Sequence, residues 1–460
     1  MSFLQTLMRC KPHKQVPQVA SLKQVLNGFD LTLLGIGAII GAGIFVLTGI
    51  VAATVAGPAV MVSYLIAAIA CALSAFSYAE LSSSLGGCGS AYGYTYVGLG
   101  ELLAWLMGWV LLVEYGLSVT AVAVGWSGYM VGFFKAIGIH IPPALCLGPF
   151  EHGIINLPAI LIILAVTGLL ILGTKQSARF NNIAVVIKIA CIVLFIAVAS
   201  FHVDVKNWKN FAPFGVFGVF NGAALVFFAF IGFDAVSTAA EETINPQRNL
   251  PLGILASLAI CTLAYVLVAA LLTGIANYTT LNVSSPVANA LLRLNERFFA
   301  GLMSVGIIAG LTTVVIVMFY GLSRIFLAIA RDGLLPPGLA KIHPKTSTPA
   351  LIIFLAGLVM AALAGFLPMK TLAELVNIGT LAAFTLVGIS ALVMRYTKPQ
   401  LHRPFRVPLS PYLPVVGIGL NLYLMWTLPP ITWFCFLAWI VIGLAVYFAY
   451  GRRHSALNKA

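Results

Sequence analysis

Twelve long apolar runs dominate this 460-residue sequence and restrict the folds that it can adopt. Each run is close to the ~20 residues that an α-helix needs to cross a bilayer. The runs are continuous and rich in Leu, Ile, Val and Ala, whereas the strands of a transmembrane β-barrel would be segments of ~10 residues with alternating polarity. The sequence therefore predicts an all-α polytopic membrane protein with about twelve transmembrane helices. We place these spans near residues 31–50, 59–82, 99–133, 156–174, 183–202, 215–238, 250–275, 300–328, 349–367, 374–395, 412–428 and 432–450.

The charged residues support this fold class. Only 8% of the residues are charged and 61% are hydrophobic, whereas a soluble domain carries roughly 25% charged residues. The net charge of +13 does not indicate a nucleic-acid-binding protein, because the Lys and Arg residues lie in short loops between apolar runs rather than on one soluble face. Seven cysteines without a CxxC pair indicate neither a disulfide framework nor a metal site.

The loops predict the orientation, since cytoplasmic loops carry an excess of Lys and Arg. With the N-terminus inside, 18 basic residues fall in the cytoplasm, 6 fall outside, and Lys188 lies within a span. Both termini are therefore expected in the cytoplasm, with the chain in the cell membrane. No cleavable signal peptide is evident, so the first span is expected to direct insertion. The polar stretch 84–97 is expected to be a cytoplasmic loop or a short re-entrant helix.

The two halves of the chain echo each other. Glycines cluster in the first span, and the sixth span contains Gly222, Gly232 and the aromatic run 227–231. Interrupted segments at corresponding positions of two halves point to the binding site of a secondary transporter. An odd number of spans per repeat makes the repeats inverted. We therefore divide the chain into a cytoplasmic segment (1–27), inverted repeat one with spans 1–5 (28–203), inverted repeat two with spans 6–10 (204–398), and two extra helices with a cytoplasmic tail (399–460).

The glycine cluster in the first span is the strongest local signal, with Gly35, Gly37, Gly41 and Gly43. Glycine interrupts a helix easily because it tolerates unusual φ and has no Cβ. The free N–H groups on one side of a break favour a carboxylate, and free C=O groups on the other side favour an ammonium. A zwitterionic amino acid carries both charges. The alternative is close helix packing through small residues, for which Gly37 and Gly41 have the GxxxG spacing.

Lys188 lies about six residues, or ~9 Å, inside the fifth span. A lysine inside the membrane is costly and is therefore a candidate functional residue. Desolvation disfavours its charged form, so that the lysine could exchange a proton near physiological pH. The alternative is a side chain that reaches the cytoplasmic interface along its apolar stem.

Two carboxylates also lie in apolar runs. Glu114 is well inside the third span, where a carboxylate needs a partner or a proton. It could relay protons, meet a cationic substrate side chain, or form a structural ion pair. Asp234, near the cytoplasmic end of the sixth span, is expected to anchor that helix.

The remaining polar signals are weaker. Met318 in the eighth span could line a pocket, although methionine more often only packs. Thr312 and Thr313 are expected to bond to their own helix. Glu241 and Glu242 belong to a turn-rich cytoplasmic connector and are possible gate charges. The sequence contains no Walker A pattern, nucleophile elbow or metal-ligand cluster, so we expect no enzyme, no ATP-driven mechanism, and no cofactor other than a proton as coupling ion.

Six segments together resemble the amino acid–polyamine–organocation superfamily, and more closely the bacterial branch of the cationic amino acid transporter family. They are spread from about residue 20 to the C-terminus. They are GFDLTLLGIGAIIGAGIFVLTG at 28–49, CGSAYGYTY at 88–96, EYGLSVTAVAVGWSGY at 114–129, KQSARFNN at 175–182, FFAFIGFDAVSTAAEETINPQRNLP at 227–251 and SRIFLAIARDGLLP at 323–336.

The resemblance implies a five-plus-five inverted repeat, alternating access and a set of site residues. The N–H groups of Ala42 and Gly43, with a break around Gly41, would bind the substrate carboxylate. Carbonyls on both broken spans would hold the amino group; these belong to Ile39 or Ile40 and to Phe228, Ala229 and Ile231. Phe228 would also close the site as a gate.

The resemblance implies roles for three further residues, and the chain departs from the family pattern at one position. Lys188 would take the place that a sodium ion holds in related carriers, Met318 would line the side-chain pocket, and Glu114 would be a buried carboxylate near the third span. Many relatives have Gly-Thr-Gly in the first span where this chain has Ala42, so a hydroxyl contact to the substrate carboxylate is lost. The bulky Met318 argues against a good fit for arginine.

The sequence thus predicts a proton-coupled symporter that imports amino acids, with Lys188 and Glu114 as proton-coupling residues. An amino acid exchanger without proton coupling and a non-transporting amino acid sensor are the alternatives. The expected partners are an L-amino acid, a proton and membrane lipids, but no nucleic acid, and an accessory small membrane subunit is possible. The sequence leaves open whether the substrate is neutral or cationic.

Overall fold

The computed structural model describes residues 9–11, 26–85, 90–172, 178–240, 243–343, 346 and 348–458. Within these ranges the chain is helical and has no strand, apart from an isolated bridge between Leu26 and Thr243. The α-helices are α2 (Gly28–Ile39), α3 (Thr48–Val51), α4 (Val60–Leu85), α5 (Ser90–Gly98), α6 (Glu101–Ala136), α7 (Leu157–Ile171), α8 (Ala178–Ser200), α9 (Gly215–Val226), α10 (Ala235–Thr238), α11 (Pro246–Ile275), α12 (Pro286–Arg293), α13 (Arg297–Arg331), α14 (Ala350–Phe366), α15 (Met369–Thr397), α16 (Tyr412–Trp426), α17 (Pro430–Val446) and α18 (Arg452–His454).

Each predicted span coincides with a helix or with a helix that is broken once. Eight helical segments in the described part of the chain are long and apolar enough to cross a membrane, and four shorter apolar helices accompany them. The protein is therefore an all-α polytopic membrane protein, as predicted. For the stretch 84–97 we expected a loop or a short helix, and its described second half is the short helix α5. Residues 86–89 lie outside the described residues. The sequence did not indicate α12, which at eight residues is too short to give a membrane signal. Glu241 and Glu242 lie outside the described residues.

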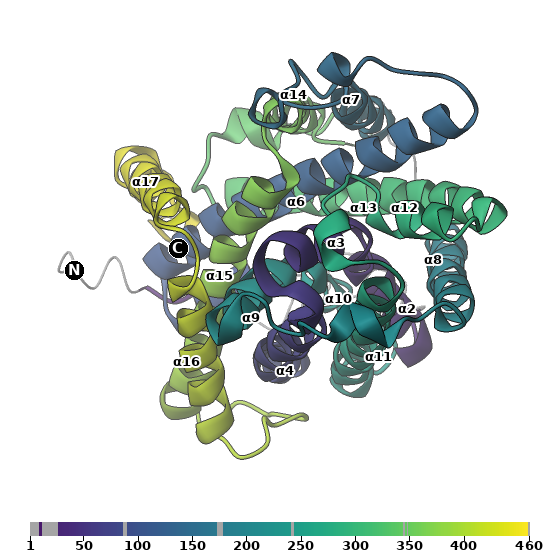
Figure 1. Cartoon of the computed structure of the whole chain (residues 1–460). Helices are drawn as coiled ribbons and strands as arrows, with labels where there is room; N and C mark the ends of the chain where they lie inside the picture. The colour runs from purple at the N-terminus through teal and green to yellow at the C-terminus, as the bar shows by residue number, and fades with distance from the viewer. Residues whose placement is uncertain are drawn as a thin grey trace.

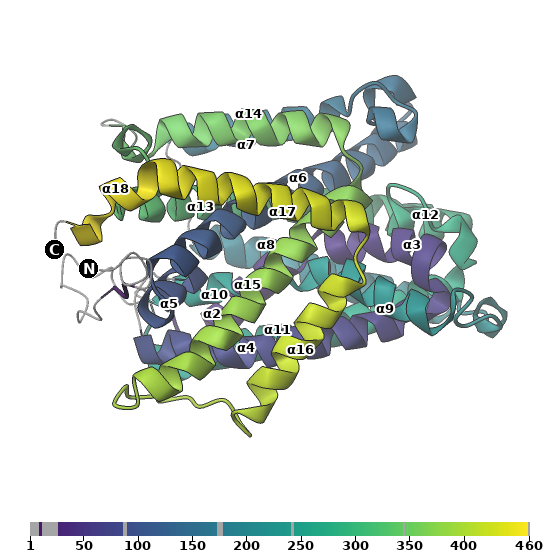
Figure 2. The ribbon, with the colours of Figure 1, turned by 90° about the vertical axis from the view of Figure 1, so that its left-hand side faces the viewer.

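The helices form a bundle around two broken segments. Figure 1 shows α2, α3, α9 and α10 near the middle, with α7 and α14 paired at the top. The long helices α6 and α13 pack along each other, and α11 packs along both α2 and α4. In Figure 2, α5 and α18 lie at one end of the bundle, and α3 and α12 lie at the other.

Both predicted breaks are present. In the first span α2 ends at Ile39, Ile40 is extended (φ −71°, ψ 103°), and a π-helical turn starts at Gly43. In the sixth span α9 passes into a 3₁₀ turn over Phe227–Phe230, and Ile231 is again extended (φ −62°, ψ 137°). The chain continues through Gly232 at φ +112°, a conformation that suits glycine. The division of the chain into two inverted repeats stays a prediction.

The two chain termini are bound to the same end of the bundle. Glu101, at the start of α6, is fully buried and accepts hydrogen bonds from the hydroxyls of Tyr96 (3.2 Å), Tyr447 (2.9 Å) and Ser455 (2.6 Å). Arg9 lies 3.7 Å from the same carboxylate. One acidic side chain thus joins the N-terminal segment, α5, the last span and the C-terminal tail.

A second carboxylate, Asp332 at the end of α13, extends this network. It accepts from Lys11 Nζ and from the Tyr92 hydroxyl, each at 2.8 Å. Burial, followed by the nearby carboxylates, raises the pKa of Tyr92 and Tyr96 well above the usual value. Both hydroxyls therefore remain protonated donors at physiological pH. We call the contacts of residues 9–11 and 455–458 with α5, Glu101 and Asp332 the terminal clasp.

We expect Glu101→Gln to lower the apparent Tm of the purified protein by several degrees. The substitution keeps the size of the side chain but removes the charge that strengthens three buried hydrogen bonds, each worth roughly 1.5–3 kcal/mol when charged. Differential scanning fluorimetry in detergent measures the change. The control is Glu296→Gln, because Glu296 forms a half-exposed pair with His202 at 3.8 Å, which contributes about 0–1 kcal/mol. Equal Tm values for the two variants would contradict the importance of the clasp.

Candidate functional site

A pocket lies where the two broken segments face α6 and α13. The empty space there, including the part that is open to solvent, is about 280 Å³. It is lined by Ala38, Ile39, Gly41, Ala42, Gly43, Ser118, Val122, Phe228, Ile231, Val314 and Met318. Seven of the nine residues predicted to bind substrate are in this set, while Ile40 and Ala229 are buried but do not line the pocket.

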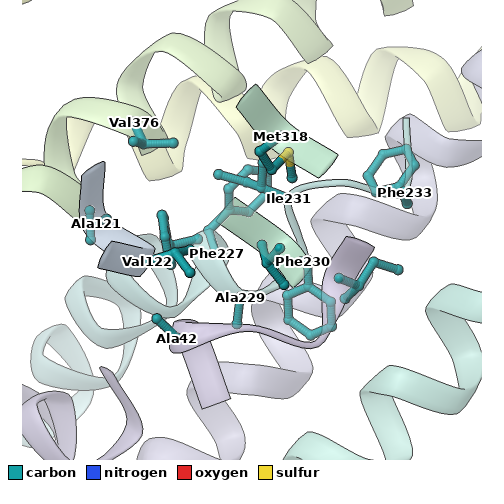
Figure 3. Packing of buried hydrophobic residues seen from close by; sticks show 14 of the residues in the cluster. Ala42, Ala121, Val122, Phe227, Ala229, Phe230, Ile231, Phe233, Met318 and Val376 are labelled. Atoms are coloured by element: carbon teal, nitrogen blue, oxygen red, sulfur yellow. The ribbon is translucent and has the colours of Figure 1, made fainter. Parts of the chain in front are cut away.

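The two breaks touch each other at a glycine. A Cβ on Gly43 would collide with the backbone and the side chain of Ala229, so this approach requires glycine. Figure 3 shows Ala42 and Ala229 on the neighbouring broken segments, and Met318 beside Ile231. Gly41 differs from Gly43, because a Cβ there would meet Val314 at 3.8 Å and Ile39 O at 3.9 Å, which are ordinary contact distances. The glycine cluster therefore has both predicted roles. Gly43 allows close packing against Ala229, and Gly41 lies beside the break at Ile40.

The end of α2 exposes backbone carbonyls that need partners. The last four C=O groups of a helix have no N–H donor within that helix. Ile36 O accepts from the N–H of Ile40 at 2.9 Å. Gly37 O accepts from Lys188 Nζ at 2.7 Å, and Ile39 O accepts from the Tyr265 hydroxyl at 2.8 Å. The same hydroxyl lies 2.9 Å from Ala229 O, on the other broken segment.

Lys188 does not reach the cytoplasmic interface, so that alternative is wrong. Its side chain is 2% exposed, and its ammonium points to Gly37 on α2. A Cβ on Gly310 of α13 would meet the methylene stem of Lys188 at 2.9 Å. The lysine on α8 is therefore enclosed by α2 and α13, which are spans 1 and 8 of the sequence prediction. The negative end of the α2 dipole favours a cation at this position.

Sequence reasoning missed Tyr265. It is a tyrosine in an apolar run, which predicts only packing, and its role depends on two carbonyls more than 30 residues away in sequence. Its ring packs against the rings of Tyr64 (5.5 Å between centroids) and Phe230 (5.2 Å). This packing fixes the hydroxyl between the two breaks. The missed lining residues Ser118, Val122 and Val314 likewise carried no local signal.

Glu114 and Asp234 are both buried, on α6 and directly before α10. The Tyr115 hydroxyl donates to Asp234 Oδ2 at 3.1 Å. Neither carboxylate oxygen of Glu114 has a hydrogen-bond partner within the part of the chain that the structure describes. Among the described residues Glu114 therefore forms no ion pair, and a buried carboxylate without a cation beside it is stable only when it is protonated or solvated. Asp234 helps to tie α10 to α6 through Tyr115.

The structure places the predicted residues of the eighth span on α13. Met318 lines the pocket and is 4% exposed. Thr312 and Thr313 donate to carbonyls of their own helix at 2.8 and 2.7 Å. The pocket lining given above contains no charged side chain. The side of the pocket opposite the breaks is therefore mainly apolar.

The comparisons with known proteins agree with this geometry. A family model described as amino acid permease matches residues 26–458, almost the whole chain. The chain belongs to the amino acid permease family. The resemblance to the amino acid–polyamine–organocation superfamily is thus confirmed. As a permease, the chain is a multi-pass membrane transporter and not an enzyme.

The chain is similar to several transporters that are named after different substrates. The chain is 49% identical to the methylthioribose transporter of Bacillus subtilis (strain 168), over 99% of this chain and 100% of that protein. It is also 49% identical to the branched-chain amino acid permease BcaP of the same organism, over 95% of each chain. Cationic amino acid transporter 4, vacuolar, of Arabidopsis thaliana is 38% identical over 85% of this chain and 65% of that protein.

We expect Gly43→Ala to destabilise this permease and Gly41→Ala to be tolerated. The added methyl group at residue 43 forces the two breaks apart, and overpacking of this kind typically costs about 1–3 kcal/mol. The methyl group at residue 41 enters ordinary contact distance. Thermal unfolding of the two purified variants beside the wild type measures the difference. A Gly43→Ala protein with wild-type Tm would show that the breaks do not need this close approach.

Proposed function

We propose that this permease is a proton-coupled symporter that imports neutral amino acids across the cytoplasmic membrane by alternating access. The observation that carries the proposal is the buried ammonium of Lys188, 2.7 Å from Gly37 O at the open end of α2. A titratable group in contact with the broken helix can link proton binding to the shape of the substrate site.

The substrate's two charged ends match the two sides of the first break. The N–H groups of Ala42 and Gly43 lie at the first turn after the break and have no intrahelical acceptor, so they favour the carboxylate. The carbonyl of Ile39, which lines the pocket, favours the ammonium group, and the family resemblance assigns the same role to the carbonyl of Ala229. Tyr265 has one hydroxyl proton for these two carbonyls, which leaves acceptor capacity for a substrate donor. Phe228 and Ile231 border the pocket from the sixth span, where Phe228 would act as the gate.

The transport cycle follows from the position of Lys188. When protonated, the lysine makes a charge-assisted hydrogen bond that favours the closed geometry at the end of α2. When it loses its proton to the cytoplasm, this bond weakens and α2 is free to move. Glu114 would serve as a second proton-accepting group, since its carboxylate forms no ion pair with a described residue. Inward release of substrate and proton would then be linked.

The polarity of the pocket supports a neutral side chain. Its lining has no carboxylate to pair with a cationic substrate, and Met318 occupies space that a long side chain would need. An apolar lining agrees with the name of one relative, the branched-chain amino acid permease BcaP of Bacillus subtilis. The 18-to-6 bias of basic residues supports cytoplasmic termini. Lipids surround the outer faces, and an accessory small membrane subunit remains a possible partner.

Methylthioribose is a second candidate substrate, because the relative with that name matches 99% of this chain. A methylthio sugar has neither an ammonium nor a carboxylate, so it would not use the open ends of the broken helices. An exchange mechanism without protons is the other alternative. Uptake of labelled valine, arginine and methylthioribose into proteoliposomes, with and without an inward proton gradient, separates these three cases. Valine accumulation that a protonophore abolishes supports the proposal.

We expect Lys188→Ala to abolish accumulation driven by a pH gradient while exchange of valine across the membrane continues. The variant loses the titratable group but keeps the backbone contacts of the substrate. Counterflow in proteoliposomes preloaded with valine shows that the variant is folded. Lys135→Ala, at an exposed position in the last turn of α6, is the matched control and should accumulate valine like the wild type. Full accumulation by Lys188→Ala would refute its role.

We expect Met318→Ser to widen the pocket and to improve arginine binding by about tenfold or more, equal to ~1.4 kcal/mol. The substitution removes three heavy atoms of an apolar side chain and adds a hydroxyl next to the substrate. Inhibition of valine uptake by unlabelled arginine measures the change. Unchanged inhibition would show that Met318 does not limit the length of the substrate side chain.

A further inference from the structure

Ser118 differs from every other residue that lines the pocket. It is on α6, it is 3% exposed, and it has the only polar side chain in the lining set. The larger apolar side chains in the same lining set include Val122, Ile231, Val314 and Met318. A single hydroxyl therefore faces an otherwise apolar pocket.

The hydroxyl of Ser118 has no hydrogen-bond partner among the described residues. Serine and threonine in a helix usually bond to the carbonyl of the preceding turn. Two neighbours on α6 are satisfied: Thr120 donates to Gly116 O at 2.8 Å, and Ser127 donates to Asn156 Oδ1 at 2.6 Å. Since buried polar groups are normally paired, an unpaired hydroxyl in a pocket wall points to a partner on the substrate.

We propose that Ser118 is a specificity-determining residue that hydrogen-bonds the side-chain hydroxyl of a small β-branched substrate, so that threonine is a substrate besides valine. This inference rests on the proposed import of neutral amino acids. Threonine and valine have nearly the same shape, and they differ by one hydroxyl in place of one methyl group. Val122, Ile231 and Val314 would pack on the shared methyl group, while Ser118 would distinguish the groups that differ.

The preference for threonine over valine would come from one hydrogen bond, which the Ser118 hydroxyl forms with threonine but not with valine. With threonine bound, the Ser118 hydroxyl and the substrate hydroxyl satisfy each other. With valine bound, the serine hydroxyl stays buried and unpaired, which is unfavourable. One such hydrogen bond corresponds to a change in affinity of up to about tenfold. Met318 and the neighbouring valines cannot supply this discrimination because they have no hydrogen-bonding hydroxyl.

The test compares the KM values for threonine and valine in proteoliposomes with wild-type protein and Ser118→Ala. We expect the substitution to raise the KM for threonine and to lower the KM for valine, so that their ratio rises about tenfold. A residue with only a structural role would change both values together and leave the ratio unchanged. Ser127→Ala is the matched control, since it removes a buried hydroxyl from the same helix outside the pocket, and it should keep the wild-type ratio.

Each other outcome decides a different point. Valine uptake by the wild type without threonine uptake, or an unchanged ratio in Ser118→Ala, would overturn the role of Ser118 and leave the proposed function intact. Uptake of neither amino acid by the wild type would overturn the proposed function itself. If Ser118→Ala transports nothing, the ratio is measured with Ser118→Cys, whose thiol is a weaker donor; a rise in the ratio supports the proposal, and a wild-type ratio overturns it.

Discussion

The rest of the site depends on the open carbonyl groups at the end of α2. A helix that stops inside a membrane protein leaves polar backbone groups where no bulk water can satisfy them. Here Lys188 and Tyr265, from two different helices, bind Gly37 O and Ile39 O. The break is therefore stable only because α8 and α11 are placed against it. The same carbonyls and the N–H groups beyond the break provide the polar contacts that a small zwitterion requires.

Close packing makes the two breaks one site. Gly43 lets the first span touch Ala229 of the sixth span, and no larger residue fits there. The rings of Tyr64 and Phe230 both pack against the ring of Tyr265 and against each other. The backbone groups at the two breaks can bind only the ammonium and carboxylate that all amino acids share. The side chains of α6 and α13 that complete the pocket therefore determine which substrate side chain is accepted.

Buried charge is distributed unevenly along the molecule. In the terminal clasp, Glu101 has three hydrogen-bond donors and Asp332 has a lysine and a tyrosine. Near the middle of the bundle, Glu114 has no hydrogen-bond partner among the described residues, and Lys188 makes one hydrogen bond. Saturated networks hold a structure in place, whereas unsaturated groups respond to a proton or a ligand. The arrangement separates a part that ties the chain ends together from a part suited to transport.

The sequence by itself determined the fold class, the twelve helical spans and the two breaks, because hydropathy over ~20 residues and clustered glycines are local signals. It also singled out Lys188, since an ammonium inside a span is rare, whereas Met318 was assigned to the pocket by the family resemblance. Only the tertiary structure decided that Lys188 contacts Gly37, that Tyr265 joins the two breaks, and that Ser118 faces the pocket unpaired. These contacts depend on which faces of distant helices meet. A single sequence does not show this, because a tyrosine or serine in an apolar run has the same local pattern wherever its side chain points.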